Sequence, residues 1–338
     1  MLSLLRSGDP SLVELECDRG SVLVAPGLQG RIFCSLEGEL VHRLDADALS
    51  APSDTAFNNV GGNSLWPAPE GGPFAFNYVP GTDQWYVQPG INRTPASVIH
   101  ADHCSVQIEK QIQLTNRKGY AIDLLWRRLV KLLDLPHVAN VHGLAALAYQ
   151  TEDSFVPLGQ YETEHVLIAP WSLEQFPGAE GIVAFGKVKD SKHAINFDFY
   201  GQPGDRIACT DTHFTFALGG EDRHQIGVTV ASSPELIGAF DINRSMLILR
   251  RAKESPGVYF NIADNDQPQG PHSAADLFSI FNGGGLGFYE LETIGAMNVE
   301  DGVFAPSKLT SETTIMKGNL ETLRRVLGEQ EQMSIDLG

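Results

Sequence analysis

The sequence predicts an all-β protein of large antiparallel sheets with one short helix near the C-terminus. Glycine occurs 34 times and proline 19 times among the 338 residues, which breaks the chain into short segments that suit strands and turns. Many of these segments alternate apolar and polar side chains with the period of two that a half-buried strand requires. Only one segment combines an apolar helical stripe with an N-terminal cap.

The strand predictions begin from the clearest alternation, at Ser105–Thr115, where Val106, Ile108, Ile112 and Leu114 are separated by polar residues. Shorter alternating or β-rich segments predict further strands at Leu12–Cys17, Ser21–Ala25, His165–Ala169, Ile195–Phe199, His213–Ala217, Gln225–Val230, Met246–Leu249 and Phe288–Ile294. The segment 121–135 fits a helical stripe about as well as a strand. Its β neighbours favour a strand.

The predicted C-terminal helix runs from Leu320 to about Gly328, and Asn319 precedes it as a capping residue. One face of this helix carries Leu320, Leu323, Val326 and Leu327. A shorter helix is expected near Trp171–Phe176, and a weaker candidate covers Asp276–Phe281.

The net charge of the chain limits the classes of molecule that it can bind. The chain has 24 Lys and Arg residues against 42 Asp and Glu residues, a net charge of −18. Because phosphate binding needs clustered Lys and Arg, we expect neither a nucleic acid nor a membrane partner.

No run of about 18 apolar residues and no signal peptide is found, which predicts a cytoplasmic protein. No linker-like stretch divides residues 1–338, so a single domain is expected.

Several motifs of large enzyme classes are absent. The sequence contains no G-x-x-x-x-G-K-[ST], no H-E-x-x-H and no G-x-S-x-G, and no G-x-G-x-x-G that opens a helix after a strand. We therefore expect no cofactor. Acid–base chemistry on a small molecule, which needs only a few convergent His, Asp and Glu side chains, is compatible with the sequence.

A Gly-, Pro- and aromatic-rich stretch at residues 51–90 contains the first candidate site. Within it, Asn63, Trp66 and Glu70 supply an amide, a flat apolar face and a carboxylate. This combination suits sugars, whose C–H faces stack on aromatic rings and whose hydroxyls bond amides and carboxylates. The alternative is a Trp that packs the loop against the core. Trp171 is either a second stacking ring or part of the core.

A second candidate is the pair Glu290 and Glu292, which share one face of a strand because they are two residues apart. Two carboxylates in an apolar strand are unfavourable if buried without a use. One of them could be a general base whose pKa is set by burial and by its neighbour. The alternative is a solvated strand face.

The histidines supply candidate general acids, chiefly His165 and His213, although a lone histidine is more often structural. His100, His103 and Cys104 resemble half of a metal site, but their spacing is not that of a zinc site. We therefore expect no metal.

In combination these segments resemble a known class. Gly61–Glu70 resembles the G-G-x-x-L-W-x-x-P-E signature of uncharacterised galactose-mutarotase-like domains, and Phe288–Thr293 resembles their Y-x-E-x-E strand. Between them, Leu114–Gly119 and His165–Phe176 follow in a similar order. The resemblance spans about Leu12–Leu327. It implies a β-supersandwich with a carbohydrate-binding cleft on one face.

The resemblance also implies a reaction. In aldose 1-epimerases, a Glu on a late strand takes the proton of the anomeric hydroxyl and a His protonates the ring oxygen. By its place in the chain Glu292 is closest to that Glu, and Glu290 is the alternative; His165 and His213 are both candidates for the acid. The epimerase motif carries Asn-Arg where this chain has Asn63 and Ser64, so an arginine that contacts sugar is missing.

Three functional interpretations follow. The first is a carbohydrate-binding protein that acts as an aldose 1-epimerase-like isomerase on a small-molecule sugar or oligosaccharide. The second is a carbohydrate-binding domain without catalysis, which the missing arginine favours. The third is a structural β domain without a sugar site. The fold hosts several activities, so fold alone does not decide between them. The oligomeric state is left open.

Overall fold

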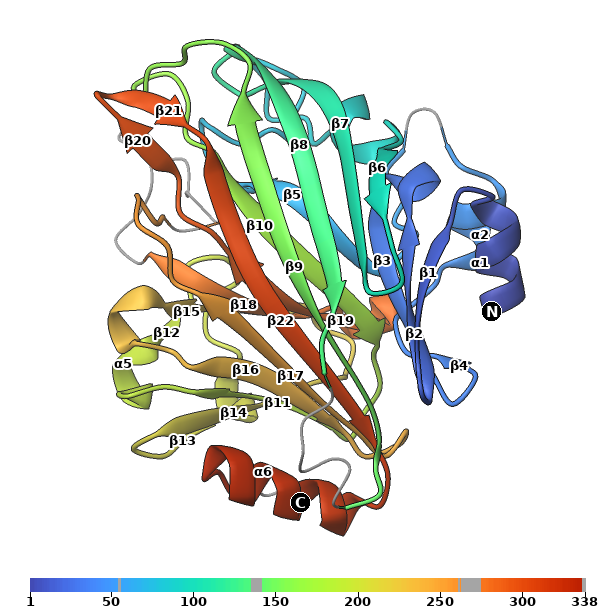
Figure 1. Ribbon diagram of the computed structural model, residues 1–338. Coiled ribbons are helices and arrows are strands. Elements are labelled where there is room, and N and C mark those ends of the chain that lie inside the picture. Colours follow the sequence, from blue (N-terminus) through green and yellow to red (C-terminus); the bar gives the residue numbers. More distant parts are fainter. Residues whose placement is uncertain (54–55, 135–141, 261, 263–274, 336–338) are drawn as a thin grey trace.

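Two large antiparallel sheets dominate the computed structural model, which describes residues 1–53, 56–134, 142–260, 262 and 275–335 (Figure 1). Strands account for 48% of the structure and helices for 14%, which confirms the predicted mostly-β class. The first sheet contains, in spatial order, β1 (Val13–Cys17), β2 (Gly20–Ala25), β3 (Arg31–Leu36), β5 (Asn63–Ala68), β10 (Ala169–Pro177), β19 (Phe288–Ile294), β18 (Asp276–Asn282), β15 (His224–Thr229) and β12 (Ile195–Asn196), with β4 (Glu39–Leu40) paired to β3.

The second sheet has the order β13 (Ile207–Cys209), β14 (His213–Ala217), β11 (Ile182–Lys187), β16 (Leu236–Asp241), β17 (Met246–Lys253), β22 (Ser307–Lys317), β9 (Ala145–Pro157), β8 (Ala121–Leu132), β7 (Ser105–Thr115) and β6 (Ser97–Ala101). A separate hairpin joins β20 (Asn298–Glu300) to β21 (Val303–Ala305). The helices are α1 (Leu2–Gly8), α2 (Ala46–Ser50), α3 (Pro89–Asn92), α5 (Ser191–Ala194) and α6 (Leu320–Glu331). Among the described residues, none of these is long and apolar enough to span a membrane.

The main apolar core lies between the sheets and follows from the period of two. In β7 the predicted apolar residues Val106, Ile108, Ile112 and Leu114 are all buried, while their polar neighbours are not. Trp126 of β8 is also buried there, and its Nε1 donates to the Leu65 carbonyl of the first sheet over 3.3 Å. Each strand therefore turns one set of side chains toward the opposite sheet.

The predicted C-terminal helix is confirmed as α6, which lies along the outer side of the second sheet (Figure 1). The Asn319 side chain caps it by accepting from the backbone nitrogens of Glu321 and Thr322. Its apolar face packs with buried residues of β16, β17 and neighbouring strands, and that face contains Leu323, Val326 and Leu327.

Four segment predictions need correction. The helices expected at Trp171–Phe176 and Asp276–Phe281 are strands β10 and β18, because both segments are buried between neighbouring strands of the first sheet. The strand expected at His165–Ala169 is irregular until Ala169, where β10 begins, and that expected at Ile195–Phe199 has only two strand residues. The ambiguous segment 121–135 forms β8 as far as Leu132, as its β neighbours suggested.

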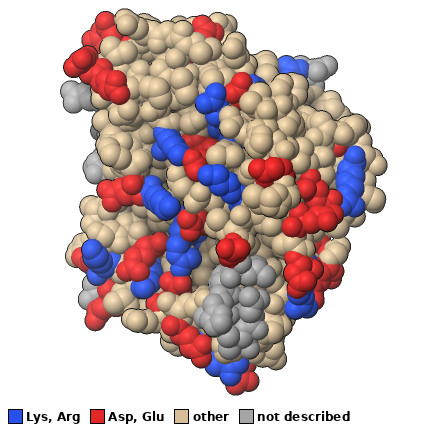
Figure 2. All heavy atoms as spheres, in the orientation of Figure 1, with Lys and Arg blue, Asp and Glu red and all other residues tan. Residues whose placement is uncertain are grey.

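The face shown in Figure 2 carries charges of both signs that are mixed rather than separated. On the second sheet, Glu152 accepts from Lys131 over 2.9 Å and also pairs with Lys308. Arg127 bonds Glu109 on the neighbouring strand over 2.8 Å. Basic side chains on this side are therefore matched by nearby carboxylates.

Candidate functional site

A pocket of about 230 Å³ opens on the outer face of the first sheet, the face directed away from the second sheet. This orientation follows from strand alternation on β10. Ser172 and Glu174 contact Arg250 of the second sheet, so the intervening side chains of Trp171, Leu173 and Gln175 point the other way, into the pocket.

Three adjacent strands, β5, β10 and β19, form the floor. Trp66 of β5 is paired in register with Trp171 of β10. On the other side of β10, Gln175 is opposite Glu290. Glu292 follows two residues later on the same face of β19, as the sequence predicted. Residues far apart in the sequence therefore meet because their strands are neighbours in the sheet.

Glu292 lies at the bottom of the pocket and is fully buried. Its carboxyl group accepts from Trp171 Nε1 over 3.1 Å and from Gln225 Nε2 over 3.2 Å. Burial raises the pKa of Glu292 well above its ordinary value, and the nearby negative charges of Glu290 and Glu70 raise this pKa further. This environment favours the protonated form of Glu292.

Glu290 has a different environment. Burial raises its pKa, whereas a hydrogen bond from Gln175, a hydrogen bond with Glu292 and the positive charges of Arg31 and Arg43 lower it. Gln175 Nε2 donates to the Glu290 carboxylate over 2.7 Å. Burial has the larger effect, so the pKa of Glu290 is raised overall, but less than that of Glu292. A single proton shared by the pair therefore lies more readily on Glu292 than on Glu290.

Glu70 adds a third carboxyl group to the pocket, just beyond the end of β5. Its backbone nitrogen donates to the Ile262 carbonyl over 2.8 Å. Burial and, to a lesser extent, the charge of Glu290 raise the pKa of Glu70 to about 7. Glu70 therefore titrates near neutral pH, the range in which a group can both give and accept a proton.

Aromatic rings line the sides of the pocket. Trp66 and Trp171 meet edge to face with centroids 6.4 Å apart, and Phe57 lies edge to face against Trp66 at 5.2 Å. Near the mouth, Trp85 is 48% exposed and Tyr200 is 41% exposed. The pocket therefore combines a carboxyl floor with apolar walls and exposed rings at its entrance.

Not every predicted site residue lies here. Asn63 points toward the second sheet, where its Oδ1 accepts from Arg128 Nη2 over 2.6 Å. His165 stacks on Tyr120 with a centroid distance of 4.2 Å, and His213 lies on β14 in the second sheet. None of the histidines in the described segments lines the pocket. Trp66, Glu70, Trp171, Glu290 and Glu292 do line it.

Sequence reasoning missed several lining residues, chiefly Gln175, Tyr200, Arg223 and Gln225. For Gln175 a signal existed: it stands four residues after Trp171, on the same face if the segment is a strand. The helix expected at that position concealed this relation. The other three occupy different strands and loops, so only the sheet order brings them to the pocket.

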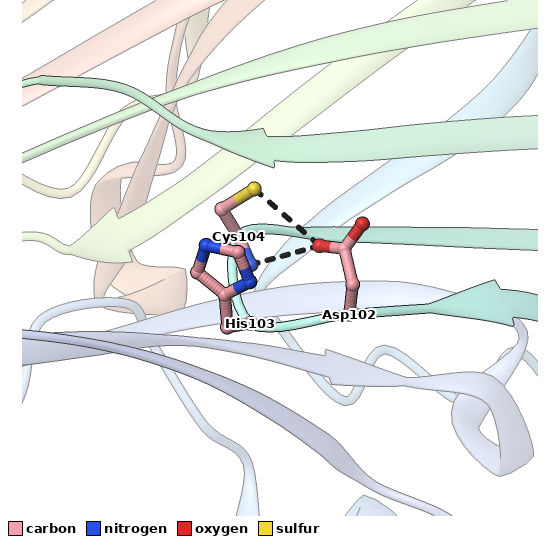
Figure 3. Close-up of side chains that lie close together, drawn as sticks. All are labelled: Asp102, His103 and Cys104. Carbon is pink, nitrogen blue, oxygen red and sulfur yellow. Dashed lines mark hydrogen bonds between the residues drawn. The ribbon is translucent and has the colours of Figure 1, made fainter.

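Within the described part of the chain, two groups of possible metal ligands lie outside the pocket. Figure 3 shows Asp102, His103 and Cys104 at the turn between β6 and β7, where Asp102 accepts from the backbone nitrogen and the thiol of Cys104. The bond from the Cys104 nitrogen, two residues on, is that of an Asx turn, and Asp102 also accepts from the backbone nitrogen of Ser105 over 2.7 Å. The second group contains Glu162, Glu164 and His165. The turn geometry accounts for the position of Asp102 without an ion.

Comparison with solved structures shows which known fold the chain resembles. A putative aldose 1-epimerase from Escherichia coli K12 matches with a TM-score of 0.53 at 11% identity, over 91% of this chain and 98% of that chain. A galactose mutarotase-like protein from Lactobacillus casei ATCC 334 has a TM-score of 0.49 at 9% identity, over 90% and 100% of the two chains. The first likeness confirms the predicted galactose-mutarotase-like fold.

No curated protein matches the chain. A family model described as a family of unknown function, DUF6786, matches residues 2–334, nearly the whole sequence. The chain therefore belongs to the DUF6786 family, an uncharacterised family with a galactose-mutarotase-like fold.

Proposed function

We propose that the pocket binds a carbohydrate and that the protein acts as an aldose 1-epimerase-like isomerase. The observation that carries this proposal is the convergence of Glu70, Glu290 and Glu292 with two tryptophans in one pocket. Aromatic rings cover the C–H faces of a sugar, and buried carboxyl groups bond its hydroxyls. A protonated carboxyl beside an ionised one can also supply an acid and a base at the same carbon.

The environments of the two floor carboxyls suggest their roles. The pKa of Glu290 is raised less than that of Glu292 because Gln175 and nearby arginines stabilise its carboxylate, so Glu290 is the better base of the two. Glu292 retains its proton because it is buried beside two negative charges, so it is the better acid. This assignment reverses the one that chain position alone suggests for Glu292. It also needs no histidine.

The proposed step opens the sugar ring. Glu290 takes the proton of the C1 hydroxyl, whose electrons form the C1=O double bond. The bond from C1 to the ring oxygen breaks, and that oxygen takes the proton of Glu292. Rotation about C1–C2 and the reverse transfers close the ring with the other anomer and restore both side chains.

Anomer exchange measured by saturation-transfer NMR tests this proposal, with reactive aldoses such as glucose and galactose as probes. General base catalysis typically contributes about 10²–10⁴-fold, so Glu290→Gln should lower the exchange rate by that order and leave sugar binding nearly unchanged. Glu292→Gln should cause a comparable loss because it removes the acid. The matched control is Glu300→Gln, at an exposed residue of β20.

The second candidate is a carbohydrate-binding domain without catalysis. The observation that favours it is that neither His165 nor His213 lines the pocket. Under this alternative, wild-type protein binds the sugar and exchanges its anomers no faster than buffer.

For the isomerase proposal, full activity in Glu290→Gln would reject Glu290 as the base.

A further inference from the structure

A second cavity of about 250 Å³ adjoins the pocket. Six of its eleven lining residues are glycines, and its acidic side chains are Glu180 and Glu221. Phe288 lines both cavities. Phe288 lies on β19 two residues before Glu290, so its ring occupies the same face as the carboxyl floor. The two cavities therefore share one lining residue. We call the second cavity the glycine crevice.

The glycine crevice is held in shape by hydrogen bonds. Asn282, which is buried, accepts from the backbone nitrogen of Gly219 over 2.9 Å and donates back to the Gly219 carbonyl over 2.9 Å. At Gly284, an added Cβ would lie 2.5 Å from the backbone oxygens of Glu221 and Asp222, so the two loops approach closely only because this residue is glycine. The crevice is thus formed before any ligand binds.

The edge of the crevice is open at two positions. A Cβ added at Gly287 would meet no atom within 4 Å, and one at Gly285 would meet only the flexible end of Glu221 within 3.5 Å. Both glycines are exposed. A ligand can therefore lie directly against the backbone here.

Size supports a ligand that fills both cavities. Ligand pockets commonly measure about 300–1,000 Å³. The main pocket, at about 230 Å³, lies below this range, and the glycine crevice adds about 250 Å³ beside it. Trp85, Tyr200 and Leu286 add exposed apolar surface at the mouth of the main pocket, beyond its carboxyl floor.

We infer that the natural ligand is a neutral oligosaccharide whose reducing-end unit occupies the main pocket and whose next unit crosses Phe288 into the glycine crevice. This inference rests on the proposed function. Only the reducing-end unit has a free anomeric hydroxyl, so that unit must lie at Glu290 and Glu292. The next unit, linked through another hydroxyl, then contacts the glycine backbone and the carboxylates of Glu180 and Glu221.

The charges of both cavities favour a neutral ligand. The ionisable carboxylates of Glu290 in the main pocket and of Glu180 and Glu221 in the glycine crevice outnumber Arg223, the basic residue that lines the main pocket. Carboxylates accept hydrogen bonds from sugar hydroxyls, but they repel the carboxylate of a uronic acid. Saccharides built from uronic acids should therefore bind more weakly than neutral saccharides of the same length.

Calorimetric titration tests the inference with glucose and galactose, the neutral disaccharides maltose, cellobiose and lactose, and the acidic disaccharide digalacturonate. At least one neutral disaccharide should bind about tenfold more tightly than its own reducing-end monosaccharide, and digalacturonate should bind more weakly than that neutral disaccharide. Gly285→Phe should remove the advantage of the disaccharide and leave monosaccharide binding unchanged. The matched control is Gly159→Phe, since Gly159 is also exposed and its added Cβ also comes within 3.0 Å of a side-chain atom, the Tyr161 hydroxyl.

The possible outcomes separate the two proposals. Monosaccharides that bind as tightly as every disaccharide would overturn the extended site and leave the proposed function standing. A disaccharide advantage that persists in Gly285→Phe, or tight binding of digalacturonate, would also overturn it. Failure of every sugar to bind the wild-type protein would reject the proposed function itself.

Discussion

Replacement of Glu70 by Gln should stabilise the protein above neutral pH. In the folded protein, burial and Glu290 raise the pKa of Glu70 from 4.5 to about 7. A folded-state pKa above the unfolded value means that the folded state binds the proton more tightly. The stability that this proton contributes is complete below about pH 4 and is lost as the pH rises through about 7.

The magnitude follows from the two pKa values. One pKa unit corresponds to about 1.36 kcal/mol, so the rise from 4.5 to about 7 corresponds to about 3 kcal/mol. Ionisation of Glu70 should therefore lower the free energy of unfolding of wild-type protein by up to this amount between pH 4 and pH 8. Glu70→Gln cannot ionise and should not show this loss, so it should be more stable than wild type at pH 8 and nearly equal at pH 4.

Urea denaturation at pH 4, 6 and 8 measures this difference. Glu300→Gln, at an exposed position, serves as the control and should follow wild type at every pH. A Glu70→Gln variant that is equally or less stable than wild type at pH 8 would refute the reasoning. It would mean that the Glu70 carboxylate is well solvated or paired, and that the pocket is not the desolvated site described above.

Other substitutions test interactions that stabilise the fold. Arg250→Met leaves the buried Glu174 without its cation and should lower the free energy of unfolding by about 3–5 kcal/mol in urea titrations, with a smaller loss when Glu174→Gln is added. Burial raises the pKa of Asp276 from 3.8 to about 8, so Asp276→Asn should become progressively more stable than wild type between pH 4 and 9, by up to about 5 kcal/mol in the same assay. Leu323→Ala should destabilise by about 2–5 kcal/mol in thermal or urea unfolding because Leu323 is fully buried under α6. Asn319→Ala should lose about 0.5–2 kcal/mol by removal of the helix cap.

The strand pattern was largely readable from the sequence because one face of most strands is buried. Ser105–Thr115, whose burial alternates, forms a strand with the predicted bounds, and Phe288–Ile294 does so too although all of its residues are buried. The shared face of Glu290 and Glu292 followed from the same alternation. Where burial imposes a period of two, the local sequence carries the structural information.

The central strands of the first sheet were harder to recognise. In β10, Ser172 and Glu174 are polar yet buried, because they bond Arg250 across the sandwich. The segment Ala169–Pro177 is buried along almost its whole length, so it shows no clear alternation of apolar and polar residues. Such a segment resembles a short buried helix when only the sequence is considered.

The site itself was predictable only in part. Trp66 and Glu70 were identified by their motif, and the family resemblance pointed to Glu292 as a site residue. The histidine that was predicted to act as the acid does not line the pocket. His165 stacks on Tyr120 instead. Chain position alone does not reveal which strand neighbours which, and the environment of each carboxyl depends on those neighbours.

The most direct test of the central claim is saturation-transfer difference NMR with neutral sugars. Wild-type protein should transfer saturation to the protons of at least one sugar. Trp85→Ala should weaken that signal because Trp85 is an exposed ring at the pocket mouth, and Tyr120→Ala should retain it because Tyr120 is a comparably exposed ring outside the pocket. Absence of transfer to every neutral mono- and disaccharide, or equal loss in both variants, would contradict a carbohydrate site at Glu290 and Glu292.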